Sequence, residues 1–460
     1  MQLSTIINSA LNKPLAFSLW LLAGLLIRIV YAVFFYRSLL EGDAYYYYEG
    51  ASLLANGQFP GTYWPPGMAM YLALWIKVIG FSPIAAILGM LVIYLLFTQK
   101  FYQVANRFLD RAITTLGVAF FAIYPAFIHH SVAPLSHLPI ALILLWLADE
   151  LWKIHLAHQE GRVNWISWIV MGALFGVGGL IRPGILFVLP VVLIFALWQM
   201  KYKAYAFLGS LLIMSLFIGS WEVWAHRETD RWVSINDASA MNFYLGNNSH
   251  TPVYRTWWLG SQDERDNPQY REFYPVWDAI RAFPEEEQSS EYQQAALEHI
   301  KEDPGLFALR TLNRIRCFYA FDTFTGSRIY KQDPLLGTIF LILDALCFVL
   351  IGLLAIWGMI GKGTLMPFKI RRTWLWLILA YGIPYFLAFS HPTYHLPITP
   401  LLALFAGAAI SKSDPAPFSF KDLPVSSRPF VYIAFLLFLY IQFEWIAQMV
   451  DRYVAVGGSF

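Results

Sequence analysis

The sequence predicts an all-α polytopic membrane protein, and three observations support this fold class. Of the 460 residues, 58% are hydrophobic and only 13% are charged, whereas soluble domains carry about a quarter charged residues. Apolar runs of about twenty residues, the length that crosses a bilayer, recur along most of the chain. The net charge is only +2, and no basic patch interleaved with aromatic residues indicates a nucleic-acid site.

About eleven apolar segments are expected to be transmembrane helices. They lie at residues 15–37, 83–105, 112–128, 134–153, 165–181, 184–200, 204–224, 336–360, 373–389, 396–411 and 429–450. The first is too long for the core of a signal peptide and is expected to remain as a span. A further apolar helix at 67–80 opens with Pro65-Pro66-Gly67. At about fourteen residues it is short for a crossing, so we place it on the membrane surface or as a re-entrant helix.

The loops between these segments predict the orientation of the chain. Cytoplasmic loops carry an excess of Lys and Arg. The loops that do so here all fall on one side if 67–80 does not cross, and they contain Lys100, Arg107, Arg111, Lys153, Arg162, Lys201, Lys203, Lys362, Lys369, Arg371, Arg372, Lys412, Lys421 and Arg428. The amino terminus is then cytoplasmic, while the loop 38–82, the segment 225–335 and the carboxyl terminus lie outside.

This orientation divides the chain into three parts. Residues 1–224 form a transmembrane catalytic module that includes the external loop 38–82, with juxtamembrane helices in that loop. Residues 225–335 form a small external, periplasmic domain of mixed structure, whose clearest helical patterns are at 289–303 and 306–320. Its acidic run Glu285-Glu286-Glu287 is typical of a solvated face. Residues 336–460 supply the last transmembrane helices.

The stretch EGDAYYYYEGASLLANG follows the first span and holds two carboxylates, Glu41 and Asp43. Asp43 is placed to cap a helix from Ala44 to Asn56 that stops at Gly57, because its side chain can accept from free amides of the first turn. That leaves Glu41 without a local role. A capped juxtamembrane helix with a spare surface charge is the simple alternative to a catalytic pair.

Two arginines lie where a charge in a membrane is costly and therefore suggests a site. Arg182 follows Gly178-Gly179 at the outer end of a span. Its guanidinium could bind a phosphate through two parallel hydrogen bonds, or it could reach to the outer interface as a structural residue. Arg28, in the first span, could serve a site or pair with a structural ion.

Histidines and aromatic residues gather at the same predicted face. The histidines are His129, His130, His137, His391 and His395, and their spacings match no zinc-ligand signature. Together with Tyr394 they could bind an anionic head group when protonated, or be ordinary hydrogen-bonded interface residues. The run Tyr45 to Tyr48, with Tyr63 and Trp64, fits either an interfacial aromatic belt or a surface that stacks on a sugar ring.

Several short motifs occur in a recognisable order. They are Asp43, Tyr47, Ala51, Leu54 and Gly57 at helical offsets, then Pro65-Pro66-Gly67, Arg182-Pro183, the Asn242 to Asn247 stretch and Tyr394-His395-Leu396-Pro397. In this order the chain resembles, over roughly residues 15 to 411, the polyprenyl-phosphate-dependent glycosyltransferases of the C-type membrane fold. This family includes protein O-mannosyltransferases and lipid A aminoarabinose transferases.

The resemblance implies inverting transfer of a hexosyl or pentosyl group from a polyprenyl-phosphate donor to a lipid, glycan or protein acceptor. The site would lie on the periplasmic face of a bacterial inner membrane. Asp43 would be the general base, and Glu41 would orient the acceptor or assist electrostatically. The residues expected to hold the donor phosphate are Arg182, His391, His395 and Tyr394, and those expected to contact substrate are Tyr47, Tyr63, Trp64 and His137.

Two positions depart from the family pattern. Members commonly have Ser-Glu where this chain has Ser136-His137, and an Arg where it has Thr393. We therefore assign no metal ligand and leave the need for a divalent cation open.

Two other classes of function also stay open. They are a lipid or solute transporter or flippase, although no duplicated halves are evident, and a non-catalytic component of an envelope assembly.

Overall fold

The computed structural model describes residues 11–35, 40–200, 205–251, 253, 273–360, 367–411 and 428–455. Within these ranges the chain is helical and contains no β-strand. This confirms the predicted all-α class. The loop cations Lys201, Lys203, Lys362, Lys412 and Lys421 lie outside the described residues.

Most helices of the first half overlap the predicted apolar segments, but the segments 112–128 and 184–200 are each divided into shorter helical pieces. The elements of this half are α2 (Pro14–Phe34), α3 (Asp43–Ala55), α4 (Pro66–Ile79), α5 (Pro83–Ala105), α6 (Arg111–Ile123), α7 (Pro125–His130), α8 (His137–Gln159), α9 (Trp165–Ile181), η2 (Pro183–Val188), α10 (Leu189–Phe195), η3 (Ala196–Met200) and α11 (Ala206–Thr229). Proline marks the start of many of these elements, since its fixed φ and missing N–H suit the first helical turn.

The second half begins with short helices and ends with long apolar ones. They are α12 (Ala238–Gly246), α13 (Phe273–Arg281), α14 (Glu285–Glu302), α15 (Pro304–Phe318), α16 (Phe324–Tyr330), α17 (Pro334–Ile360), α18 (Phe368–Leu387), η6 (Pro392–Ile398), α19 (Thr399–Ile410) and α20 (Arg428–Ala455). The helices expected near 289–303 and 306–320 are α14 and α15.

Six helical segments are long and apolar enough to cross a membrane, among the residues that the structure describes. They are Leu15–Phe34, Pro83–Ala105, Ala206–Thr229, Pro334–Ile360, Pro392–Ile410 and Arg428–Val450. Shorter apolar helices are Pro66–Ile79, Arg111–Ile123, Trp165–Ile181 and Pro183–Trp198. The chain is therefore compatible with a polytopic membrane protein, and the count of eleven spans stays a prediction.

Close helix packing in the bundle depends on glycine. A side chain at Gly172 of α9 would collide with the backbone of Ser210 in α11, and one at Gly358 of α17 would collide with the backbone of Phe405 in α19. In a membrane, helices associate through such close backbone approach because burial of apolar surface supplies no driving force there. These contacts hold the pairs α9–α11 and α17–α19 together.

Buried cations in the helical bundle form their hydrogen bonds and ion pairs with other groups of the bundle. Arg28 donates to Ser131 Oγ (2.5 Å), Phe121 O (2.9 Å) and Gly24 O (3.0 Å), and its guanidinium lies 3.6 Å from the centre of the Tyr94 ring. Arg28 is thus structural, although its partners are carbonyl and hydroxyl groups rather than the ion that the sequence suggested. Buried Asp149 of α8 pairs with Lys100 of α5, with Arg107 just after α5 and with Lys153 one turn later in α8.

The segment 225–335 differs from the mixed structure expected of it. Its described residues form only helices, because the turn-forming residues separate short helical stretches rather than strands. The acidic run that was expected on a solvated face forms the first turn of α14, where carboxylates stabilise the positive end of the helix dipole. A small core joins α12, α13 and α14 and contains Tyr244, Leu245, Phe273, Tyr274, Trp277, Ile280, Tyr292 and Ala296.

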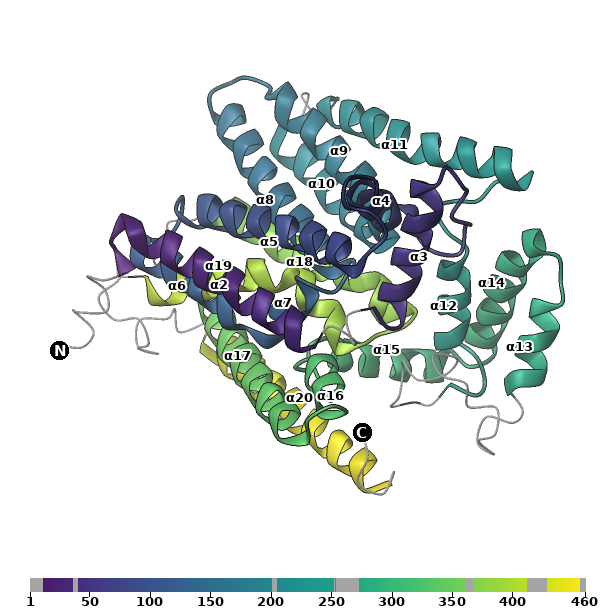
Figure 1. The fold of residues 1–460 in the computed structure, drawn as a ribbon. Helices are drawn as coiled ribbons and strands as arrows, with labels where there is room; N and C mark the ends of the chain where they lie inside the picture. Colours follow the sequence, from purple (N-terminus) through teal and green to yellow (C-terminus); the bar gives the residue numbers. More distant parts are fainter. Residues whose placement is uncertain are drawn as a thin grey trace.

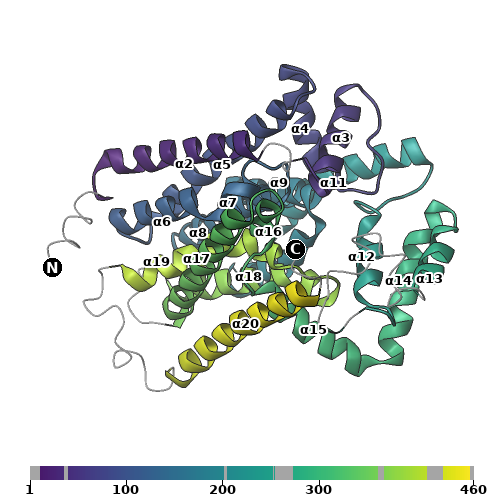
Figure 2. The ribbon, with the colours of Figure 1, turned by 60° about the horizontal axis from the view of Figure 1, so that its bottom comes forward.

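Figure 1 shows how these parts are arranged. The helices α12, α13 and α14 lie at one end of the bundle, beside α3, while α6 and α19 lie at the other end. Figure 2 gives the same relation from a view turned by 60°. The first loop and the segment 225–335 therefore meet at one end of the molecule.

Candidate active site

Asp43 lies at the start of α3, and its backbone setting differs from the prediction. The prediction that Asp43 caps the helix is wrong, since Gly42 occupies the cap position and no side-chain cap bond forms. Gly42 has φ +60°, a conformation that favours glycine, and this turn makes Asp43 the first helical residue. The Asp43 carboxyl is therefore free of a capping role. At the other end the helix stops at Gly57 (φ +76°), as predicted.

The start of α4 fixes the end of α9 next to this site. Gly67, in the Pro-Pro-Gly stretch, lies directly on the backbone of Leu180 and Ile181. A Cβ atom at Gly67 would be 2.7 Å from Ile181 N and 2.8 Å from Leu180 C. The next residue after this contact is Arg182, which ends α9. The Pro-Pro-Gly motif thus positions Arg182 relative to the first loop.

Replacing Gly67 by Ala is expected to destabilise the protein by about 1–3 kcal/mol, because the added methyl group must displace the α9 backbone. Thermal unfolding in detergent measures this change. Gly219→Ala is the matched control, since a Cβ atom at Gly219 would have nothing within 4 Å. Equal melting temperatures for the two variants would contradict this account of the motif.

The guanidinium of Arg182 lies among hydroxyl and aromatic groups. It donates to Ser136 Oγ (3.2 Å) and lies 4.6 Å from the centre of the Tyr394 ring and 5.2 Å from that of Tyr385. Ser136 also shares a hydrogen bond with the hydroxyl of buried Tyr47, one turn after Asp43 in α3. Side chains from α3, the start of α8, α18 and η6 therefore converge on this arginine. No ion pair joins it to a carboxylate among the described residues.

Asp43 combines exposure to solvent with a perturbed pKa. Its side chain is exposed, yet protein surrounds it on most sides, and burial raises the pKa of its carboxyl above the usual value. The nearby charges of Arg182 and Arg328 act in the opposite direction and favour the carboxylate. An accessible carboxylate with a raised pKa and two nearby cations suits a general base.

Glu41 has a partner of its own. Its Oε2 atom accepts from Arg328 NH1 at 3.0 Å, and the carboxylate is largely exposed. Arg328 belongs to α16 and also lies over the Phe324 ring, 4.5 Å from its centre. The pair connects the first loop to α16, so Glu41 has a structural contact that the sequence did not reveal.

Three of the predicted histidines form a buried cluster beside Tyr394. The rings of His130 and His137 are 4.5 Å apart and those of His129 and His130 are 5.2 Å apart, while His137 stacks at 6.1 Å on Tyr394. The ring nitrogens of His130 and His137 have no hydrogen-bond partner in the described part of the chain. Burial lowers the pKa of His129 to about 3 and that of His130 well below its usual value. Burial thus favours the neutral form of both rings, which supports the reading of interface residues over that of cations for an anionic head group.

The two histidines near the late Tyr-x-x-Pro motif, His391 and His395, lie in different surroundings. His391 lies 5.9 Å from the Tyr394 ring, and its Nδ1 atom accepts from Thr393 N at 3.2 Å. Thr393, at the position where the family has Arg, donates through Oγ1 to buried Asp322 at 2.8 Å. His395 instead stacks on Phe348 at 3.9 Å inside the bundle. The structure thus brings His391 to the Tyr394 side of the site, whereas His395 packs away from Arg182.

Among the described residues, no group of three or more His, Cys, Asp or Glu side chains lies together so as to hold a metal ion.

The predicted substrate residues Tyr63 and Trp64 lie beside Tyr46 and Tyr47. Trp64 stacks on Tyr46 at 5.8 Å and meets Tyr47 edge-on at 5.5 Å and Tyr63 at 5.1 Å. Aromatic residues therefore line the side of Asp43 that faces the segment 225–335.

Comparison with known proteins supports the same assignment. Residues 64–221 match the family described as dolichyl-phosphate-mannose-protein mannosyltransferase. Over these residues the chain is similar to a family of membrane glycosyltransferases that use polyprenyl-phosphate-linked sugars. No curated protein matches the chain. The matched residues include Ser136, His137 and Arg182, while Asp43 and Tyr394 lie outside them and join the site only in the folded structure.

The Asn242 to Asn247 stretch, another of the motifs noted in the sequence, makes structural contacts. In the Asn242 to Asn247 turn, the Asn247 amide donates to Leu387 O at 3.0 Å, and fully buried Arg314 donates to the same carbonyl at 2.9 Å and to Gly246 O. A side chain at Gly246 would collide with the backbone of Ala388. The turn therefore docks α12 against the end of α18, just before the stretch that holds Tyr394.

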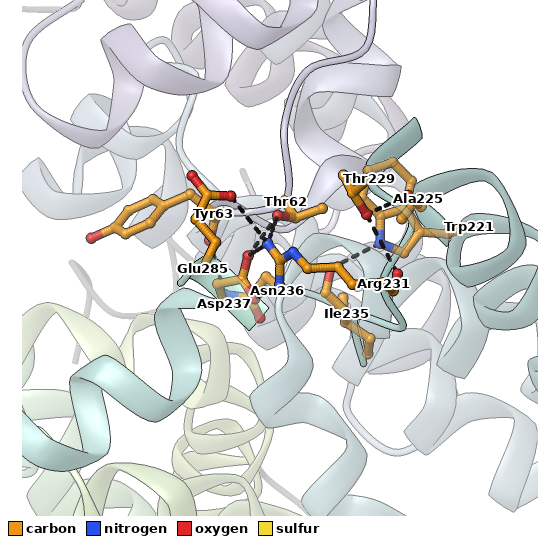
Figure 3. Close-up of polar contacts among 10 residues, drawn as sticks. All are labelled: Thr62, Tyr63, Trp221, Ala225, Thr229, Arg231, Ile235, Asn236, Asp237 and Glu285. Carbon is orange, nitrogen blue, oxygen red and sulfur yellow. Dashed lines mark hydrogen bonds and ion pairs between the residues drawn. The ribbon is translucent and has the colours of Figure 1, made fainter. Parts of the chain in front are cut away.

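A second connection joins the first loop to the segment after α11 (Figure 3). Arg231 binds Asp237 through two hydrogen bonds of 2.9 and 2.5 Å, and it donates to Thr62 Oγ1 at 2.7 Å. Thr62 in turn donates to Asp237 Oδ2 at 2.5 Å. Half-buried polar groups that satisfy one another in this way fix the geometry of the loop. We call Thr62, Arg231 and Asp237 the loop clasp.

The clasp extends along the backbone of the loop. The carbonyl of Tyr63 accepts from Ala238 N at 3.3 Å and from Asn236 Nδ2 at 3.2 Å, and Glu285 of α14 lies 3.8 Å from Arg231. Sequence reasoning did not single out Arg231 or Asp237. Neither residue lies in an apolar run or a known motif, and their partner Thr62 is about 170 positions earlier in the chain.

Proposed function

We propose that the protein transfers a sugar, with inversion, from a polyprenyl-phosphate donor to an acceptor at the outer face of the membrane. The observation that carries the proposal is the proximity of an accessible carboxylate, Asp43, to an arginine held without a carboxylate partner, Arg182. One group can remove a proton from an acceptor, and the other can bind a phosphate. The family match supplies the substrate class, a polyprenyl-phosphate-linked sugar.

In the proposed step, the acceptor hydroxyl oxygen attacks the anomeric carbon of the donor from the face opposite the phosphate. The new oxygen–carbon bond forms as the bond from carbon to phosphate oxygen breaks. The hydroxyl proton passes to Asp43, and the electron pair of the broken bond leaves with the polyprenyl phosphate. A single displacement of this kind inverts the anomeric centre. Arg182 stabilises the charge that develops on the departing phosphate.

The groups around Arg182 have supporting roles in this proposal. Tyr385 and Tyr394 hold the plane of the guanidinium, and Ser136 occupies one of its donors. The neutral histidines can offer hydrogen bonds rather than charge to the donor. Arg182 is therefore the main cation for the phosphate, and His391 is a secondary contact on the Tyr394 side.

Reconstitution tests the function directly. The full chain in proteoliposomes receives dolichyl-phosphate mannose as the first donor, and sugar release from the polyprenyl phosphate is measured by mass spectrometry. Release that depends on the protein is expected. Movement of the lipid-linked sugar between leaflets without release would instead identify a transporter.

The raised pKa of Asp43 predicts the pH dependence of the reaction. A base works when deprotonated, so kcat/KM is expected to fall as the pH decreases through the pKa of Asp43. Because that pKa lies above the value of an ordinary aspartate, about 3.9, the fall begins at a higher pH than an exposed aspartate would give. A profile measured between pH 4 and 8, on the order of one unit per step, checks this expectation. A flat acid limb would contradict it.

Replacing Glu41 by Gln is expected to have a small effect. Its exposed ion pair with Arg328 contributes about 0–1 kcal/mol to stability, and salt screens it. Transfer rate and melting temperature should therefore stay close to those of the unaltered chain. A loss of transfer as large as that expected for Asp43→Asn would give Glu41 a catalytic role instead.

A further inference from the structure

Two buried ionisable side chains hold the short helix α7 and the residues on either side of it. Arg28 of α2 donates to Phe121 O near the end of α6 and to Ser131 Oγ just after α7, at 2.9 and 2.5 Å. Asp344 of α17 accepts from Ala126 N in the first turn of α7 at 2.8 Å. The backbone that carries the histidines of α7 is therefore fixed by side chains from two other helices.

The two histidines of α7 differ in their hydrogen bonds. His129 Nδ1 lies 2.8 Å from the hydroxyl of Tyr31 in α2, so this ring has a protein partner. His130 and His137, the latter at the start of α8, are 0% and 7% exposed. Within the described ranges, none of their four ring nitrogens has a hydrogen-bond partner. Buried polar groups are normally hydrogen-bonded, so these rings indicate a place where another molecule binds. We call His130 and His137 the histidine pair.

The histidine pair lies next to the arginine proposed for the donor phosphate. Its two rings are 4.5 Å apart. His137 directly follows Ser136, whose hydroxyl accepts from Arg182 at 3.2 Å. The His137 ring also stacks at 6.1 Å on Tyr394, and the Arg182 guanidinium lies 4.6 Å from the centre of that tyrosine ring. Because the donor sugar is bonded directly to its phosphate, a phosphate on Arg182 would place the sugar within reach of the pair.

Hydrogen-bonding capacity decides which chemical group matches the pair. Two imidazolium rings 4.5 Å apart and close to an arginine would repel one another, so we expect neutral rings. A neutral imidazole has one donor and one acceptor nitrogen, and a hydroxyl group likewise both donates and accepts. A phosphate or carboxylate only accepts and an ammonium only donates, so each would leave half of the nitrogens unpaired. Two hydroxyl groups can pair with all four.

We propose that the histidine pair is a donor subsite that binds two hydroxyl groups of an uncharged sugar. This inference rests on the proposed function and deepens it, because it assigns the transferred group to neutral sugars rather than to amino sugars or uronic acids. The sequence grouped His130 with the other histidines as a candidate for binding anions. The proposal instead gives His130 a role in selecting the sugar.

Competition between two lipids tests the subsite. The full chain in detergent is mixed with dolichyl-phosphate mannose and with dolichyl phosphate, which lacks the sugar, and the bound species are counted by native mass spectrometry. The unaltered chain is expected to prefer the mannosyl lipid. The double variant His130→Phe, His137→Phe keeps two rings but removes the four nitrogens. It is expected to bind the mannosyl lipid about tenfold more weakly and dolichyl phosphate as before. Its melting temperature should not fall, because no hydrogen bond between described residues is lost.

Three further changes serve as comparisons. The double variant His130→Asn, His137→Asn keeps a donor and an acceptor on each side chain, so it should retain part of the preference. Arg182→Gln should weaken both lipids alike, since both carry the phosphate. His155→Phe replaces another buried histidine of α8, one that is hydrogen-bonded to Gln159 at 3.2 Å, and it should change the binding of neither lipid.

The outcomes separate the subsite from the proposed function. An unchanged preference in the double Phe variant would overturn the subsite and leave the two rings with water alone. Equal weakening of both lipids by that variant would also overturn it, because the pair would then act on the phosphate. Sugar release from dolichyl-phosphate mannose is measured separately in the unaltered chain. Preferential binding without release would overturn the proposed transfer and leave the subsite, whereas release without a preference for the mannosyl lipid would overturn the subsite alone.

Discussion

Replacing Asp43 by Asn is expected to lower the rate of sugar transfer by about 10²–10⁴-fold, the usual contribution of a positioned general base. The amide keeps the size of the side chain but cannot accept the acceptor proton. The variant should remain folded, because Asp43 is exposed and caps no helix. Initial rates in proteoliposomes, with dolichyl-phosphate mannose as the donor, measure the loss.

The matched control is Glu49→Gln in the same helix. Glu49 is also an exposed carboxylate of α3, but it is six residues later and on a different side of the helix. Removing its charge should leave transfer unchanged. Near-normal transfer by Asp43→Asn would remove Asp43 from the role of base, whereas equal losses in both variants would indicate an effect of net charge on the helix.

Replacing Arg182 by Gln is expected to reduce kcat/KM for the donor by roughly ten- to a hundredfold. Charge-assisted hydrogen bonds contribute about 1.5–3 kcal/mol, and the transition state carries more charge on the phosphate than the bound donor does. Arg182→Lys should recover part of the loss, because it restores the charge but not the two parallel donors. Steady-state kinetics with varied donor concentration measure both effects.

Arg162→Gln provides the control for charge. Arg162 is exposed in the loop before α9 and pairs only with the exposed Glu160 among the described residues. Its replacement should not change donor kinetics. A normal kcat/KM for Arg182→Gln, with Tyr385 and Tyr394 left around an uncharged side chain, would contradict the assignment of Arg182 to the donor phosphate.

The positions of most helices could be predicted from the sequence, because local residues determine where a helix begins and ends. Apolar runs predicted the long helices, and the Pro-Gly punctuation around 65–67 and Gly80 predicted α4 to within a residue at each end. One prediction was wrong for a local reason. A glycine able to adopt φ +60° took the cap position expected for Asp43.

The site could be predicted only in part, because its geometry depends on contacts between distant residues. The motifs predicted that Asp43, Arg182 and Tyr394 belong to one site. Nothing in the local sequence indicated that Tyr385 would flank Arg182 or that His395 would stack on Phe348. The pair Tyr381 and Tyr385, one turn apart in an apolar helix, was the pattern that could have pointed to Tyr385. No sequence pattern predicted the loop clasp, because Arg231 and Asp237 resemble ordinary charged surface residues in the sequence.

The way Arg182 is enclosed has a consequence for the biogenesis of the protein. Asp43 is made early, Arg182 near the middle, and Tyr385 and Tyr394 near the end of the chain. At about 5–20 residues per second, the roughly 350 residues between Asp43 and Tyr394 take about 20–70 s to synthesise. During that interval the nascent chain holds Asp43 and Arg182 but lacks the two tyrosine rings that flank Arg182. The arrangement that we propose for transfer is therefore completed last, when nearly all helices have been made.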